Sequence, residues 1–224
     1  MMYEKIINLI GEDNFKKIKN TKILLIGVGG VGSFAFEALI RSGFQNITII
    51  DKDIVEESNI NRQLVANLNT IGKKKVEVAK NNAENINENI KITAINKFLD
   101  KDNINELDHD FDYIIDACDT LNTKLELIKF ASINNIKIIS SMGVGNRVDA
   151  SKIKISRLDK TNNDPLAKKL RKLVKEHKLD NKIPVVCSDE IPYKKGEVNS
   201  MITSPSIAGI LIVNYIINDI INPY

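Results

Sequence analysis

The chain has 224 residues, 43% hydrophobic and 27% charged, and its 32 basic side chains against 29 acidic ones leave a formal net charge of +3. These proportions exclude a disordered tail and are ordinary for a globular protein with a buried core. The two cysteines, Cys118 and Cys187, form no Cys-x-x-Cys pair, which excludes a disulfide framework and a four-cysteine zinc site. We therefore expect a cytoplasmic protein that binds no zinc.

Neither end of the chain has the pattern of an export signal or a stable membrane span. Charged residues interrupt the apolar pattern of residues 1–11, unlike the uninterrupted apolar part of a signal peptide. The most apolar stretch, residues 207–221, contains polar residues and falls short of the roughly 20 apolar residues that a membrane span needs. We predict that it forms a helix packed on the core.

Apolar runs of strand length alternate with segments of helical period, which predicts β-α-β units and a parallel sheet. In chain order these are helix 4–18, strand 22–27, helix 31–42, strand 46–51, helix 73–87, strand 91–96, strand 113–116, helix 121–134 and strand 137–141. The pattern predicts an α/β fold: a Rossmann-like, doubly wound, mainly parallel sheet with helices on both faces.

The pattern loosens after Gly145. We expect a strand at 152–157, a helix opened by the capping acid and proline of Asp164-Pro165, a short strand at 183–187, a loop at 193–199 and a final helix at 204–218.

A glycine-rich turn follows the first strand. Gly27, Gly29 and Gly32 satisfy Gly-x-Gly-x-x-Gly between a strand and a helix, and Asp51 ends the next strand, where an acid can bind ribose hydroxyls. Glycine lets the backbone approach a phosphate, and the following helix offers unpaired N–H groups. The pattern indicates a nucleotide site; the alternative is a tight turn without a ligand.

Three later groups of residues disfavour a nicotinamide or flavin dehydrogenase. Asn59, Arg62 and Gln63 place amides and a guanidinium beyond the ribose acid, where arginine suits phosphate oxygens, although the asparagines could instead cap a helix. A run of three lysines ends at Lys75 near a helix start, where cations need an anionic partner or solvent. Asp119 follows another strand, where it could hold Mg²⁺ against a triphosphate or cap the next helix.

Taken together, these motifs resemble the ThiF/MoeB-type adenylating enzymes, the superfamily that includes ubiquitin-activating enzymes. The segments that carry the resemblance are GVGGVGS (27–33), IDKD (50–53), NINRQ (59–63), GKKKVE (72–77) and DACD (116–119). The resemblance implies ATP-dependent adenylation of a carboxylate, with Arg62, Lys75 and Asp119 as catalytic residues and Asp119 binding Mg²⁺. It implies that ATP is held by Gly27, Gly29, Gly30, Gly32, Asp51, Asp53, Asn59, Arg62, Gln63 and Lys75.

The second half of the chain is similar to one branch of that superfamily, the tRNA threonylcarbamoyladenosine dehydratases. The similarity lies in residues 141–145, 148–149, 160–171 and 186–190. It implies a single domain over residues 1–224, with a nucleotide-binding core at 1–150 and a branch-specific loop, basic helix and C-terminal helix at 151–224. The alternatives are an adenylyltransferase for a ubiquitin-like sulfur carrier and a regulatory nucleotide-binding module.

The resemblance also implies partners. These are tRNA bearing threonylcarbamoyladenosine, a second copy of the chain in a homodimer, and sulfur-transfer proteins. Lys5 is the nearest candidate for a cation that reaches the partner's ATP site. A basic helix face would suit tRNA, or be merely solvated; it comprises Lys168, Lys169, Arg171, Lys172, Lys175 and Lys178. We expect both cysteines to be inert core thiols.

Overall fold

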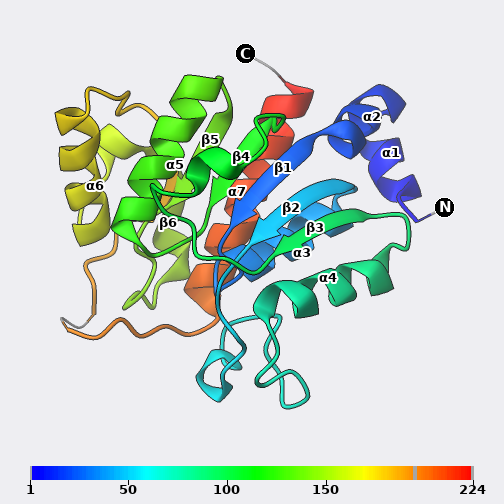
Figure 1. The fold of residues 1–224 in the computed structure, drawn as a ribbon, viewed down its shortest axis with the longest axis horizontal. Coiled ribbons are helices and arrows are strands. Elements are labelled where there is room, and N and C mark those ends of the chain that lie inside the picture. Colours follow the sequence, from blue (N-terminus) through cyan, green and yellow to red (C-terminus); the bar gives the residue numbers. More distant parts are fainter. Residues whose placement is uncertain (1, 194–195, 223–224) are drawn as a thin grey trace.

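The computed structural model describes residues 2–193 and 196–222 (Figure 1). A seven-stranded sheet with the order β3-β2-β1-β4-β5-β7-β6 forms its centre. The strands are β1 (Lys22–Ile26), β2 (Asn46–Ile50), β3 (Lys91–Ile95), β4 (Tyr113–Asp116), β5 (Lys137–Ser141), β6 (Ile153–Arg157) and β7 (Pro184–Ser188). Neighbouring strands pair in parallel, except that the edge strand β6 is antiparallel to β7. The predicted doubly wound α/β fold is confirmed.

Helices cover both faces of the sheet (Figure 1). They are α1 (Glu4–Ile10), α2 (Glu12–Asn20), α3 (Gly32–Arg41), α4 (Lys75–Ile86), α5 (Leu121–Asn134), α6 (Pro165–Glu176) and α7 (Thr203–Ile221). Strand β1 shows how two cores arise, because successive side chains of a strand point to opposite faces. Ile23 and Leu25 join the core that holds α3, α4 and α7, whereas Leu24 and Ile26 join the core that holds α5 and α6.

The strand order reverses beside β1, which pairs with β2 on one side and with β4 on the other. The loops that leave β1 and β4 meet there so closely that a Cβ on Gly27 would lie 2.8 Å from the carbonyl oxygen of Ala117. Gly27 also has a φ of +89°, which favours glycine. A crevice at such a switch point is where open α/β sheets bind ligands.

Two expected helices differ from the prediction, one because it is divided and the other because it begins later. The single helix expected over residues 4–18 is wrong: Gly11, with a φ of +83°, separates α1 from α2. The helix expected from residue 73 begins at Lys75 instead, because Lys74 is extended and forms a bridge with Ile54. The predicted loop at 193–199 includes residues 194–195, which lie outside the described part of the chain.

Helix α7 is long and apolar enough, by length and composition, to cross a membrane. In the structure its Ala208, Ile212 and Ile216 belong to the core beside α3 and the sheet. Gly209 allows close packing on α3, since a Cβ there would lie 2.4 Å from the carbonyl oxygen of Val31. The prediction of a helix packed on the core is confirmed.

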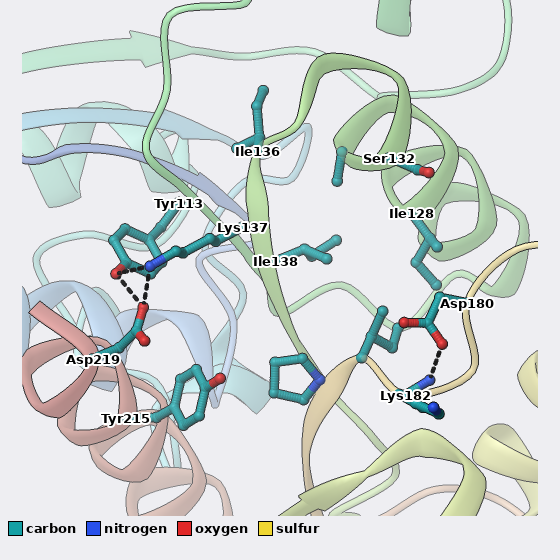
Figure 2. Close-up of a pocket in the computed structure, with 13 residues that line it drawn as sticks. Tyr113, Ile128, Ser132, Ile136, Lys137, Ile138, Asp180, Lys182, Tyr215 and Asp219 are labelled. Carbon is teal, nitrogen blue, oxygen red and sulfur yellow. Dashed lines mark hydrogen bonds and ion pairs between the residues drawn. The ribbon is translucent and has the colours of Figure 1, made fainter. Parts of the chain in front are cut away.

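The amino edge of the sheet, opposite the crevice, holds a pocket of about 370 Å³. Figure 2 shows Tyr113 and Lys137, the first residues of β4 and β5, directed towards Asp219 of α7. The Tyr113 hydroxyl donates to Asp219 Oδ2, and Lys137 Nζ lies 2.6 Å from the same oxygen. This cluster ties the last turns of α7 to the sheet.

The Asp219 cluster predicts a pH-dependent contribution to stability. Burial raises the pKa of Asp219, but the hydrogen bonds from Lys137 and Tyr113 outweigh burial and hold it below the ordinary value of 3.8. The ionised form is therefore favoured by folding, so its stabilisation is present above pH 3.8 and is lost as the pH falls through the lower folded-state pKa. Asp219→Asn should lower the free energy of unfolding by about 1 kcal/mol at pH 7, with a difference that shrinks in acid. Urea unfolding measures this; Asp110→Asn, in an exposed pair with Lys22, is the control and should have little effect. A pH-independent loss in Asp219→Asn would contradict the account.

Candidate active site

A cleft of about 1170 Å³ opens at the carboxyl edge of the sheet, over the switch point. It is lined by the glycine loop, the segment after β2, the turn around residues 56–63, the loop after β4, the segment after β5 and the start of α6. Every predicted site residue except Gly32 lines it: Gly27, Gly29, Gly30, Asp51, Asp53, Asn59, Arg62, Gln63, Lys75 and Asp119. The structure thus brings these separate motifs to one cleft.

The glycines of the loop have different roles. A Cβ on Gly32 would lie 1.8 Å from the carbonyl oxygen of Gly27, so Gly32 is required by the turn itself. Around Gly29 the nearest atom is Gln63 Nε2, 3.9 Å from where a Cβ would stand. Protein packing therefore does not require glycine at position 29, and its bare backbone leaves room for a ligand in the cleft.

Asp51 holds the glycine loop in place. Its Oδ2 accepts a hydrogen bond from the Val28 N–H at 2.6 Å, and its Oδ1 accepts one from the Asp53 N–H at 2.8 Å. Each carboxylate oxygen can accept more than one hydrogen bond. Asp51 can therefore shape the loop and still have a free acceptor position for a ribose hydroxyl.

Lys75 brings a buried cation to the cleft. Its side chain is 6% exposed, and its Nζ lies 3.1 Å from Oδ2 of the half-exposed Asp53. The Asp53 carbonyl also accepts from the Lys75 N–H, so the pair is fixed through backbone and side chain together. Asp53 therefore contacts Lys75 directly. The contact holds the ammonium group at the wall of the cleft.

The NINRQ segment contains both structural and cleft-facing side chains. Asn59 is buried and its Oδ1 accepts from the Glu56 N–H, so the capping alternative is confirmed for this residue. Arg62 Nη1 donates to the Ser58 carbonyl and to Asn61 Oδ1, which directs the guanidinium at the cleft wall. Gln63 Oε1 is buried and, among the described residues, has no donor. Such an acceptor could take a hydrogen bond from a nucleotide.

The buried ion pair between Lys124 and Asp116, beneath the cleft, was not predicted from the sequence. Lys124 and Asp116 are both 0% exposed, with Nζ 3.0 Å from Oδ2, and the same ammonium donates to the Ser141 carbonyl at 2.7 Å. The pair joins the carboxyl ends of β4 and β5 and so supports the loop that carries Asp119. The available signal was the position of Lys124, three residues after Leu121 and four before Ile128, on the apolar stripe of α5.

Asp119 is exposed at the cleft and accepts a hydrogen bond from the Thr120 hydroxyl. The N-cap of α5 is Thr120, so Asp119 is not the capping residue, and the described residues show no side-chain bond at this cap. The described chain also contains no cluster of three or more metal-ligating side chains. One carboxylate suits Mg²⁺ that takes most of its ligands from a triphosphate and water.

The cysteines lie in surroundings that suppress reactivity. Burial, then the nearby Asp116 carboxylate, raises the pKa of Cys118, although Lys124 opposes the change. Burial raises the pKa of the fully buried Cys187 to about 11. Both thiols therefore stay protonated at neutral pH. Cys187 is a core residue as expected, whereas Cys118 is only partly buried and borders the cleft.

The chain belongs to the ThiF family, whose profile matches residues 3–221. It is 34% identical to a tRNA threonylcarbamoyladenosine dehydratase of Bacillus subtilis, over 95% of this chain and 91% of that protein. It is 37% identical to the Escherichia coli enzyme of that name, over 75% of this chain and 63% of the relative. The solved structure of the E. coli enzyme in complex with ATP superposes with a TM-score of 0.91 at 30% identity, covering 98% of this chain and 93% of that one. These comparisons confirm the resemblance indicated by the motifs.

The roles assigned to Gly29 and Gly32 predict that the same substitution affects ATP binding at one position and stability at the other. Gly29→Ala should leave the melting temperature near that of the wild type but weaken ATP binding by about tenfold or more, because the new methyl group enters the ligand space. Gly32→Ala should lower the free energy of unfolding by about 3 kcal/mol or more, because its Cβ would overlap the Gly27 carbonyl. Thermal unfolding and calorimetric ATP titration measure both effects. Wild-type ATP affinity in Gly29→Ala would contradict the ligand role of this loop.

Proposed function

We propose that this chain is an ATP-dependent tRNA threonylcarbamoyladenosine dehydratase. The observation that carries the proposal is the cleft itself, where Arg62, Lys75 and Asp119 gather around the glycine loop. The fold likeness to an ATP-bound enzyme of this name, along almost the whole length of both chains, supports the same reading. The substrate would be the threonyl carboxylate of the modified adenosine in tRNA.

The reaction joins anions and so explains the cations at the cleft. A carboxylate oxygen attacks the α-phosphorus of ATP, a P–O bond forms, and the bond to pyrophosphate breaks. Arg62 and Lys75 offset the repulsion between the reactants and the charge that develops on pyrophosphate. Internal attack of the threonylcarbamoyl group on the acyl adenylate then closes a ring and expels AMP. One carboxylate oxygen leaves in AMP and a proton is released, so the nucleoside loses the elements of water.

The donor set at Asp119 fits a magnesium ion that arrives with ATP. Its carboxylate is exposed in the cleft and is not used to cap α5. Magnesium bound there would neutralise phosphate charge. The protein needs no nucleophilic side chain for this chemistry, which agrees with the two protonated thiols.

The basic face of α6 supports a tRNA partner, with two corrections to its predicted members. Arg171 does not belong to a free surface, because its Nη1 donates to the Thr161 carbonyl at 2.8 Å and also bonds the Thr161 hydroxyl. The exposed cations on α6 are Lys168, Lys169, Lys172 and Lys175, and Lys169 borders the cleft. Lys178 is exposed too, but α6 ends at Glu176, so the prediction that Lys178 lies on the helix face is wrong. Phosphate contacts from these side chains would make tRNA binding sensitive to salt.

A homodimer is part of the proposal. Lys5 is exposed on α1, and the neighbouring Tyr3 hydroxyl donates to the Ile40 carbonyl at the end of α3. This places Lys5 at the amino edge of the sheet, away from the cleft of its own chain. A contribution of Lys5 to an ATP site would therefore require a second copy. Exposed Leu64, Leu68 and Ile71 offer apolar surface for such an interface. Sulfur-transfer partners stay a prediction from the resemblance.

The proposed function predicts which substrate releases AMP. With Mg-ATP, the wild type should form AMP and pyrophosphate in the presence of tRNA that bears threonylcarbamoyladenosine, and none with a small carrier protein ending in Gly-Gly. Asp119→Asn should lower the rate by about 100-fold or more, with partial recovery at high Mg²⁺ and an unchanged melting temperature. Asp108→Asn, the same change at another exposed acid, is the control. Pyrophosphate formation with the carrier protein alone, which would leave AMP on the carrier as an acyl adenylate, would overturn the tRNA assignment. Full activity of Asp119→Asn would remove Asp119 from the site.

A further inference from the structure

Arg147 is a buried guanidinium in the wall of the cleft that has no assigned role in the chemistry described above. It is 2% exposed and follows β5 by six residues. Its Nη2 donates to the Asn163 carbonyl at 2.7 Å, whereas Nε and Nη1 have no hydrogen-bond partner among the described residues. Arginine stays charged in proteins, so a buried guanidinium with idle donors is costly unless an anion completes it.

The nearby carboxylates of Asp164 and Glu190 bind backbone N–H groups, and neither forms an ion pair with Arg147 among the described residues. Asp164 accepts from the Gly143 N–H at 2.8 Å and from the Ala167 N–H at 3.0 Å. Glu190 accepts from the Val148 and Asp149 N–H groups. Burial lowers the pKa of Arg147, and the charges of Asp164 and Glu190 partly oppose this effect.

The same contacts fix the backbone on both sides of Arg147. Asp164 holds the loop before it, Glu190 holds the two residues after it, and the Ser204 hydroxyl donates to the Arg147 carbonyl at 3.2 Å. Three separate elements thus hold one short loop. The guanidinium is preorganised and would lose little entropy on meeting a ligand.

Arg147 lies where it could contact the acyl substrate, because it borders the same cleft as the glycine loop. Ser204 precedes Pro205, and Pro205 Cβ lies 3.2 Å from where a Cβ of Gly30 would stand. Arg147 and the glycine loop are therefore held by adjacent residues of α7 and border the same cleft. The phosphates already have Arg62, Lys75 and the loop. Arg147 belongs instead to the segment after β5, and its guanidinium bonds the Asn163 carbonyl just before α6.

We propose that Arg147 binds the carboxylate of the acyl substrate and presents it to the α-phosphate of ATP. This inference rests on the proposed function and adds the residue that recognises the group to be activated. A guanidinium matches a carboxylate with two parallel hydrogen bonds, which would satisfy donors that are otherwise idle. Arg147 thereby distinguishes tRNA that carries the threonylcarbamoyl group from tRNA that lacks it.

The test compares two tRNAs that differ only in that group, with and without threonylcarbamoyl on the adenosine. Affinities are measured with an ATP analogue whose bridging oxygen between the α- and β-phosphates is methylene, so that no adenylate forms. The wild type should prefer the modified tRNA by about tenfold or more, and Arg147→Met should reduce this preference to about twofold or less. Arg147→Lys should retain part of it. Arg157→Met, which removes an exposed guanidinium paired with Asp159, is the matched control and should keep the full preference.

Two further readouts separate this role from a structural or nucleotide-binding one. Arg147→Met should keep the affinity for the ATP analogue and a melting temperature at or above that of the wild type, because a buried and incompletely paired charge is removed. An unchanged preference in Arg147→Met overturns the inference, as does an equal loss of affinity for both tRNAs, which would indicate a phosphate contact. Weaker binding of the ATP analogue overturns it as well. If Arg147→Met does not fold, the ratio of affinities for the two tRNAs is measured in Arg147→Lys and Arg147→Gln instead, with the same expected loss of preference. A wild type without any preference would instead contradict the proposed function.

Discussion

The absence of a side chain at Gly27 is the constraint on which the carboxyl edge of the sheet depends. At this residue the loops leaving β1 and β4 come so close that a Cβ would meet the Ala117 carbonyl at 2.8 Å. That contact sets the glycine loop beside the segment that carries Asp119. The buried Asp116–Lys124 pair then fixes the same loop from below and ties it to the end of β5. Backbone proximity and a buried charge pair together place the predicted motifs at one cleft.

The cations in and beneath the cleft differ in how completely they are paired. Lys124 is fully paired inside the protein and so is structural, whereas Lys75 has one half-exposed partner, Asp53. Arg62 bonds neutral oxygens, and Arg147 has a single carbonyl partner. Arg62, Lys75 and Arg147 all line the cleft. Incompletely paired cations suit a reaction whose main obstacle is repulsion between anions.

Features set by local sequence were predictable. Strands stood out as short apolar runs, Asp164 caps α6 by accepting from the Ala167 N–H, and the strand–turn–helix context located the glycine loop. Features set by distant segments were not. Arg147 is defined by contacts from Asn163 and Ser204, and Arg171 turns inward to Thr161, which no pattern of spacing reveals. Gly11 was visible in the sequence, but only its φ of +83° shows that it divides a helix. Lys124 could have been identified from the sequence, because it is a charged residue within the apolar stripe of α5.

The proposed reaction of this cleft removes water from a modified nucleoside in tRNA at the expense of ATP. The most direct measurement is mass spectrometry of nucleosides from tRNA bearing linear threonylcarbamoyladenosine, after incubation with the protein and Mg-ATP and digestion mild enough to preserve a ring. We expect the nucleoside to lose the mass of one water, in a reaction that depends on ATP and is abolished in Arg62→Ala. A nucleoside that stays linear, while the protein still exchanges pyrophosphate with a Gly-Gly carrier, would contradict it.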